Sequence, residues 1–464
     1  MLSLNRACAA LLACGLIATA CAPGERSPVA PPSVVVQPTR PPSTPLPTQE
    51  PLSSVIPAIQ SSNDSGQLLV ISSLTGKALD AYKPIKLGAY YNFAFSPDGR
   101  TLALITNSQL DLIDLRSWTY RASDVNVHGW LSAAVYSPDG QRLAMATGYK
   151  ESELRIVDAH SGAITASATL DFSVRNIQFA SDQKEIMVFG PRADGNGVST
   201  GSPVAALFAV SDLSRLWSVD LKGIRDGVFP RNPRTPNIYQ PGASFYYSPA
   251  VLFAPGRDML YIVHGNEDKL TVVDFGARKA RTLAIRPKLS LLDRLLSLTA
   301  GVARAKGMDG TSKQGAISPD GKTLYVVALT EAYTQDSSGN WNMTTTHGGL
   351  QEIAARDGTI LRHTDTAATS LAMSSDARHL YLTGWDEPGY STGWSEVYDM
   401  ASEKILLHMD SIQLTPTRHL DGSLALASTD GYGSNLCRMS SVDPATWTVI
   451  GSWKGRCLGW LTDP

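Results

Sequence analysis

Three aspartates stand in nearly identical SPDG motifs, and an aspartate beside a glycine is typical of catalytic and metal-binding loops. The motifs place Asp98, Asp139 and Asp320 in third position. Proline fixes the φ angle of a type I turn, serine can hydrogen-bond locally, and glycine takes the left-handed position. The motifs recur in different repeat units, so their carboxylates cannot converge on one ligand. We interpret SPDG as a structural turn.

A second set of aspartates ends a recurring apolar strand and precedes a short turn, where a carboxylate can accept amide hydrogen bonds. These residues are Asp114, Asp158, Asp274, Asp399 and Asp443. The chain contains no H-E-x-x-H, P-loop or dinucleotide motif. DGNG at Asp194 and DSSGN at Asp336 lack the acidic residue that completes a calcium loop. The sequence therefore predicts no catalytic residue, no metal site and no cofactor.

The SPDG turns mark a repeat of about 40 residues. The clearest unit reads LSAAVY, SPDG, RLAMAT, ELRIVD, AHSG and AITASATL, which alternates strands with turns. Turns of this kind begin near Ser96, Ser137, Ser181, Pro255, Ser318, Ser374 and Pro416. Four short strands in each unit of this length are the signature of a β-propeller blade.

This pattern resembles exported β-propellers with WD-like and YVTN-like repeats, over roughly residues 60 to 464. The resemblance implies an all-β chain that forms a single propeller of four-stranded blades. Residues 67–82 match the outer two strands of a blade, and the terminal CLGWLTDP matches an innermost strand. We therefore expect strands from both termini to close the ring. Eight blades are favoured if SSVIPAIQ near Ser53 supplies the missing strand; seven blades are the alternative.

The N-terminus predicts export. Residues 7–20 form an apolar run that ends in ATAC, which resembles the lipobox of bacterial lipoproteins, with Ala18 where leucine is preferred. The resemblance implies cleavage before Cys21 and a lipid on its sulfur, so the protein would be anchored to the cell membrane or outer envelope. Cleavage at the A-x-A sequence to give a secreted protein is the alternative. We expect a signal peptide at 1–21, a Pro/Ser/Thr-rich stalk at 22–58 and the propeller at 59–464.

Two cysteines remain in the expected domain, Cys437 and Cys457, and outside the cytoplasm such a pair predicts a disulfide. The chain carries 40 Lys and Arg against 42 Asp and Glu, a formal net charge of -2. This balance provides no basic surface for nucleic acid.

Alternating strand directions place all the long insertions on one face of the ring, which we call the elaborated face. The insertions are residues 190–203, 222–247, 286–312, 330–348 and 385–394. The spacing of leucines in 287–307 predicts a short helix there. Loops on a rigid scaffold commonly carry binding sites. The candidate binding residues are Tyr239, Tyr246, Tyr333, Trp341, Trp385, Tyr390 and Trp394.

These features predict a binding or scaffolding module in the cell envelope that holds an unknown protein, peptide or glycan on its elaborated face. The alternative is an exported propeller enzyme, lactonase-like, dehydrogenase-like or glycan-active, with a site at the mouth of the central channel. Propeller sites can draw single residues from many blades, so missing local motifs leave this alternative open.

Overall fold

The computed structural model describes residues 51–460 except 62–65, 88–90, 107–108, 127–130, 149–150, 195–197, 232–243, 288–309, 375, 386–392, 411–412, 431–436 and 457. The chain divides into two units, residues 1–46 and 47–464, and all described residues belong to the second. The one described helix is the short 3-10 turn η2 (Leu52–Ser54). No helix of this described part is long and apolar enough to span a membrane.

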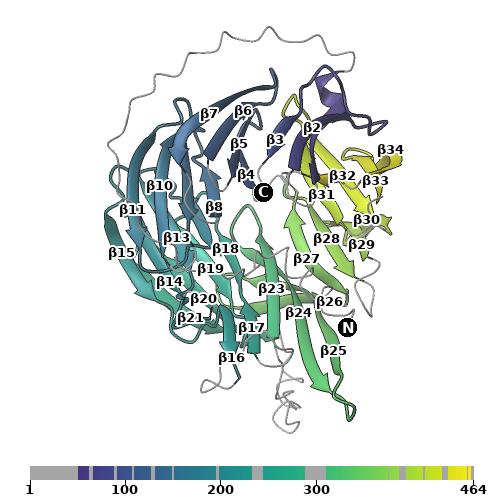
Figure 1. Cartoon of the computed structure of the whole chain (residues 1–464). Coiled ribbons are helices and arrows are strands. Elements are labelled where there is room, and N and C mark those ends of the chain that lie inside the picture. Colours follow the sequence, from purple (N-terminus) through teal and green to yellow (C-terminus); the bar gives the residue numbers. More distant parts are fainter. Residues whose placement is uncertain are drawn as a thin grey trace. The chain divides into compact units, whose positions relative to one another are not determined.

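Seven four-stranded antiparallel sheets form propeller blades around a ring (Figure 1). From the inside outwards, three of them are β35 (Leu458–Trp460), β1 (Val55–Ser61), β2 (Gly66–Ser72), β3 (Ile85–Leu87); β4 (Tyr91–Phe95), β5 (Thr101–Thr106), β6 (Gln109–Asp114), β7 (Thr119–Asn126); and β8 (Leu131–Tyr136), β9 (Arg142–Thr147), β10 (Ser152–Asp158), β11 (Ile164–Leu170). The other four are β12 (Asn176–Phe179), β13 (Glu185–Gly190), β14 (Val204–Ala209), β15 (Arg215–Asp220); β18 (Ala250–Phe253), β19 (Met259–Val263), β20 (Lys269–Asp274), β21 (Lys279–Ala284); β27 (Ala368–Met373), β28 (His379–Trp385), β29 (Gly393–Asp399), β30 (Lys404–Met409); and β31 (Gln413–Arg418), β32 (Leu424–Asp430), β33 (Cys437–Asp443), β34 (Thr448–Gly455).

One further sheet of the ring has seven strands. Its blade-like part is β23 (Gly310–Ile317), β24 (Thr323–Gln335), β25 (Trp341–Ala354) and β26 (Thr359–Thr364). The insertions before this blade add β16 (Gly227–Pro230) and β17 (Ser244–Ser248) at the inner edge and β22 (Arg286–Pro287) at the outer edge. The ring therefore has seven regular four-stranded blades, which is the alternative to the favoured number of eight. Chain insertions widen the one remaining sheet.

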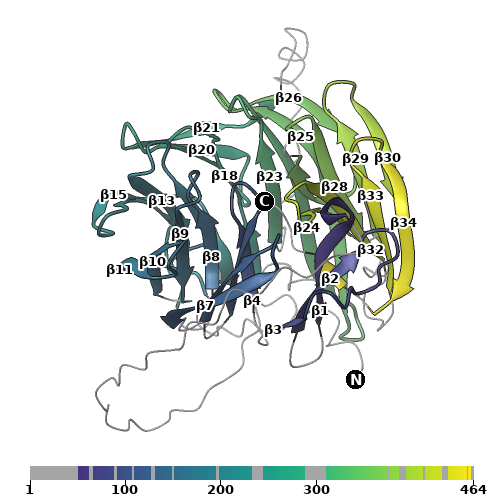
Figure 2. The ribbon, with the colours of Figure 1, turned by 90° about the horizontal axis from the view of Figure 1, so that it is seen from above.

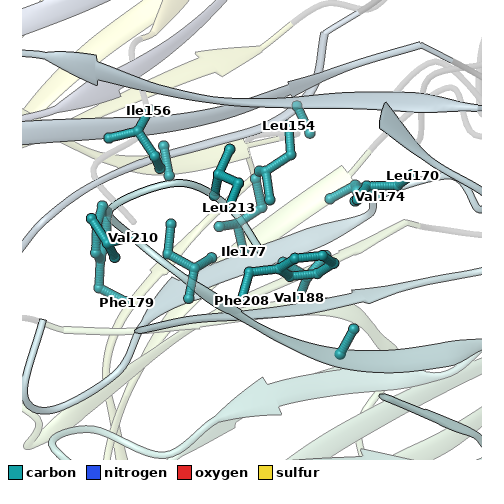
Figure 3. Close-up of a cluster of buried hydrophobic side chains, with 14 of the residues drawn as sticks. Leu154, Ile156, Leu170, Val174, Ile177, Phe179, Val188, Phe208, Val210 and Leu213 are labelled. Atoms are coloured by element: carbon teal, nitrogen blue, oxygen red, sulfur yellow. The ribbon is translucent and has the colours of Figure 1, made fainter. Parts of the chain in front are cut away.

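Neighbouring sheets are held together by apolar side chains between their faces. Eight buried clusters each join two adjacent sheets, and together they pass around the whole ring. Figure 3 shows one of them, in which Leu154 and Ile156 of β10 pack against Val188 of β13 and Phe208 of β14. Central strands such as β5 and β14 are buried on both faces, so their sequences are almost continuously apolar.

The ring is closed by strands from both ends of the described chain, as predicted. β35 pairs with β1, which pairs on its other side with β2. The apolar strand VIPAIQS begins at Val55, within the last residues of the expected stalk. The outermost strand differs from expectation, because β3 is Ile85–Leu87 and not the earlier KALDAY segment. Figures 1 and 2 show that no gap interrupts the ring where β1 to β3 lie beside β31 to β34.

The recurring aspartates stabilise turns, as the sequence predicted. In the first SPDG motif the Ser96 hydroxyl donates to Asp98 Oδ1 at 2.6 Å, and the amide of Arg100 donates to the same oxygen at 3.1 Å. The other two motifs repeat this pattern. At the ends of third strands, Asp158 Oδ1 accepts the Ser161 amide at 2.6 Å. Local hydrogen bonds thus account for these carboxylates.

We expect the closing strand to be essential for stability. Trp460 is 7% exposed, and its Nε1 donates to Thr429 Oγ1 at 2.7 Å. Trp460→Ala should lower the free energy of unfolding by about 3–5 kcal/mol, since it leaves a large cavity in the seam. The matched control is Tyr120→Ala, whose side chain is 50% exposed on β7. Urea unfolding midpoints measure both; equal shifts would show that the seam has no special role.

Candidate binding face

The longest insertion within a blade forms a two-stranded ribbon, whereas the sequence predicts a loop there. We define the ribbon as Leu329–Gln335 of β24 and Trp341–His347 of β25, which pair up to Gln335↔Trp341. β23 accompanies β24 only as far as Glu331, so the last residues of β24 pair with β25 alone. Figure 1 shows the ribbon extending beyond the neighbouring strands. None of its described side chains belongs to the buried clusters of the ring.

The turn at the ribbon tip is the DSSGN segment. Asp336 Oδ1 accepts the amides of Ser338 and Asn340 at 2.9 Å each, so its carboxylate supports the turn. Below the tip, the Tyr333 hydroxyl donates to Glu331 Oε2 at 3.4 Å. Burial raises the pKa of Tyr333 to about 12, so this predicted binding residue stays a neutral hydrogen-bond donor.

The second elaboration beside the ribbon is the β16–β17 hairpin. β17 pairs in parallel with the start of β23, and a Cβ at Gly310 would lie 2.7 Å from the Tyr246 carbonyl oxygen. This close approach requires glycine. The hairpin is thereby fixed to the sheet that carries the ribbon.

One face of the hairpin carries an aromatic layer, which we define as Phe229, Phe245 and Tyr247. Tyr247 is edge-on to Phe229 at 5.9 Å and stacked with Phe245 at 6.3 Å. The guanidinium of Arg225 lies 5.4 Å from the Phe229 ring, and that of Arg231 lies 4.9 Å from the Phe245 ring. Both arginines are exposed, so the layer presents positive charge over aromatic surface.

An ion pair with one buried partner, Asp226, lies in the connection that leads into this hairpin. Arg175 precedes the inner strand β12, Ser248 precedes β18, and Asp226 lies in the connection between those two blades. One Arg175 nitrogen is 2.5 Å from Asp226 Oδ1, and the other donates to the Ser248 hydroxyl at 2.7 Å. Asp226 is 3% exposed, and its Oδ2 accepts no hydrogen bond from the described residues. The pair fixes the connection that leads into β16.

His264 follows β19 at the same end of the ring and is 1% exposed. Its Nε2 lies 2.8 Å from Thr271 Oγ1. Burial lowers its pKa to about 4, because the protonated ring would lose its hydration. The next residue packs closely, since a Cβ at Gly265 would be 3.0 Å from the Thr311 carbonyl oxygen. His264 therefore remains neutral at physiological pH.

The predicted binding residues fall into three groups. Tyr246 and Tyr333 lie in the seven-stranded sheet, and Trp341 begins β25. Trp385 ends β28 and Trp394 lies on β29 of the next blade, where Trp394 stacks on His408 at 6.3 Å and packs against a buried cluster. Trp394 thus packs against the cluster that joins its blade to the seven-stranded sheet. Tyr239, Tyr390, Cys21, Cys457 and the predicted helix lie outside the described residues.

The sequence did not single out Arg175, Asp226, Arg225 or Arg231. Arg175 and Asp226 are 51 residues apart, and no local pattern links them. In the described ranges, no group of three or more His, Cys, Asp or Glu side chains is placed to hold a metal ion.

The sheet order and the closed ring define a β-propeller protein. No protein-family model matches the sequence, and no curated protein matches it. The chain is similar to a solved structure of the dihydro-heme d1 dehydrogenase NirN in complex with DHE. The two are 12% identical with a TM-score of 0.53, over 90% of this chain and 76% of that chain. At this identity the likeness shows the propeller fold alone.

His264 makes stability depend on pH. Its folded-state pKa of about 4 lies below the ordinary value of 6.5, so between these values the unfolded chain binds more protons. Stability from this residue should fall by roughly 2 kcal/mol from pH 7 to pH 5. His264→Gln should remove that component, whereas His160→Gln, in an exposed turn, should follow the wild type. Urea titrations at both pH values provide the measurement. A wild-type pH dependence in His264→Gln would contradict the assignment.

Proposed function

We propose that the protein is a binding module that holds a partner protein on its elaborated face. The observation that carries the proposal is the ribbon, a pair of strands that projects from the ring and whose described side chains lie outside the buried clusters of the ring. Ordering these residues costs conformational entropy, and the buried clusters of the ring contain none of their described side chains to offset this cost. Contacts with a partner would offset that cost.

The aromatic layer supports a protein as the partner. Tyrosine, phenylalanine and arginine are enriched where protein interfaces bind tightly, since they bury large areas and pair with carboxylates. Arg225 and Arg231 are exposed above the layer, and Met343 on the ribbon is 38% exposed. An acidic and apolar protein surface would complement this combination.

The proposal includes a location in the cell envelope. It is supported by the apolar leader, Cys21 in its lipobox-like context and the Pro/Ser/Thr-rich segment that follows. A lipid on Cys21 would hold the propeller at the membrane through a stalk, where it could meet other exported proteins. The disulfide between Cys437 and Cys457 is part of the same proposal. In its support, Cys437 is buried and lies opposite Gly455, two residues before Cys457.

The second candidate, an enzyme at the channel mouth, is favoured by one observation. Asp226 is a buried carboxylate with one oxygen that accepts no hydrogen bond in the described region, beside the partly exposed Arg175. Such a pair could bind or polarise a small substrate. A substrate that binds there should be lost in Asp226→Asn, whereas partner binding at the ribbon should remain.

Site-specific photo-crosslinking tests the binding module. A photoreactive residue at Asn342, exposed on the ribbon, should cross-link a defined partner in envelope extracts. The control position is Lys322, whose side chain is 75% exposed beside an SPDG turn at the opposite end of β24. We expect a product from Asn342 and none from Lys322. The same products from both positions, or none from Asn342, would contradict the proposal.

Mass spectrometry tests the envelope location and the disulfide. The mature N-terminus should be a diacylglyceryl-modified Cys21, and the peptides that contain Cys437 and Cys457 should separate only after reduction. Cys21→Ser should release an unlipidated protein into the soluble fraction. An unmodified Cys21 would exclude the anchor, and free thiols in the unreduced protein would exclude the disulfide.

A further inference from the structure

Lys313 is a cation on the inner edge of the ring for which the described residues provide no bonded partner. It lies on β23, with which β17 pairs only as far as Ser312. Lys313 is therefore the first residue of β23 whose inner side pairs with no described strand. Its side chain is half-buried. Within the part of the chain that the structure describes, this side chain forms no ion pair and no hydrogen bond.

The strand pattern directs the Lys313 side chain toward the β18–β21 blade. Side chains alternate between the two faces of a strand, so residues two apart share a face. A Cβ at Gly315 would lie 3.2 Å from the Leu252 side chain of β18, and Ile317 belongs to the buried cluster that joins this blade to the seven-stranded sheet. Lys313 shares their face. Its side chain therefore lies between two blades, next to an apolar cluster.

The ammonium group of Lys313 is poorly compensated in this position. Burial lowers the pKa of Lys313, and the attraction of Asp268, an exposed residue between β19 and β20, offsets only part of this effect. Burial is also the main reason that the pKa of His264 is low, and the charge of Lys313 lowers it further. A charge removed from water normally has a bonded counter-charge. Among the described residues Lys313 has none.

The other charged groups in this corner of the ring are already paired. The guanidinium of Arg175 bonds the Ser248 hydroxyl beside β23 and forms an ion pair with Asp226. Between β19 and β20, Lys269 is paired with Glu267. The charge without a bonded partner is thus that of the amine on β23. An oxyanion is the group that would complete it, since carboxylate and phosphate oxygens accept strong hydrogen bonds from ammonium groups.

We propose that Lys313 binds an oxyanion, the carboxylate or phosphate group of a small molecule, between the β18–β21 blade and the seven-stranded sheet. The partial loss of hydration that makes the free amine costly strengthens its hydrogen bonds to such a ligand. This small-molecule site is separate from the ribbon. It goes beyond the proposed binding of a partner protein and does not depend on it.

A purely structural role for Lys313 predicts different behaviour. A lysine that only packs covers apolar surface with its aliphatic stem, and methionine, with a stem of similar length, would replace it without loss of any binding. Removal of a poorly hydrated charge should also leave the urea midpoint of unfolding unchanged or raise it. Lys313→Met should therefore remain folded and lose only the anion.

Amine labelling tests the site in the full-length protein. Reductive methylation with formaldehyde is followed for each lysine by mass spectrometry, and the control is Lys322, which is 75% exposed beside an SPDG turn. Inorganic phosphate or succinate should slow the methylation of Lys313 about tenfold at roughly ten times its Kd, by mass action, and leave Lys322 unchanged. No protection by either anion, or equal protection of both lysines, would overturn the proposal.

Two variants identify the residue responsible. Lys313→Met should weaken binding of the protecting anion at least about tenfold in titration calorimetry. Lys269→Met removes the same charge from the neighbouring turn, where it is already paired, and should bind the anion as the wild type does. Binding that survives Lys313→Met, or that falls equally in Lys269→Met, would show that Lys313 forms no site. The anion that binds more tightly assigns the ligand to phosphates or to carboxylates.

One further measurement separates this inference from the proposed function. Cross-linking of the partner from Asn342 should be the same in Lys313→Met as in the wild type. Saturable anion binding without a cross-linked partner would uphold the oxyanion site and contradict only the binding module. A cross-linked partner without anion binding would uphold the binding module and overturn only the oxyanion site.

Discussion

The structure depends on the packing of each sheet against two neighbours. A sheet with apolar side chains on both faces cannot be stable alone, so every blade requires the next, and the last requires the first. The pairing of β35 with β1 meets this requirement, since it brings the two ends of the described chain into one sheet. Trp460 and Ile56 lie in the buried cluster that joins this sheet to β31–β34. Closure of the ring therefore pairs residues that are 400 positions apart, such as Ile59 and Gly459. The closed ring is the rigid base of the elaborated face.

That constraint restricts where the chain can vary. Turns between first and second strands are short and are fixed by the Ser and Asp hydrogen bonds of the SPDG motif, as at Ser137 and Asp139. The insertions lie between the second and third strands of a blade, as the ribbon does, or in the connections between blades, as β16, β17 and β22 do. The seven-stranded sheet shows the result: β16, β17, β22 and the ribbon all extend a blade whose central part still packs like the others.

The sequence could predict what is local and repeated. The SPDG turns and the four-stranded blades follow from such repeated patterns, and the structure confirms them. The ribbon and hairpin could not be predicted in this way. The parallel pairing of Tyr246 with Gly310 joins segments 64 residues apart, and the Arg175–Asp226 pair spans 51 residues. Such contacts depend on how blades meet in space, which no periodicity in one segment encodes.

The seven-stranded sheet ends at β16 on its inner side and at β22 on its outer side, and the ribbon extends two of its central strands. β16 ends in Pro230 and is flanked by Arg225 and Arg231, features that discourage further pairing. The Trp341–His347 strand of the ribbon carries neither a charged residue nor a proline, although the ribbon extends beyond the neighbouring strands. Its threonines lie outside the buried clusters of the described ring, so this strand can vary without altering a described core contact.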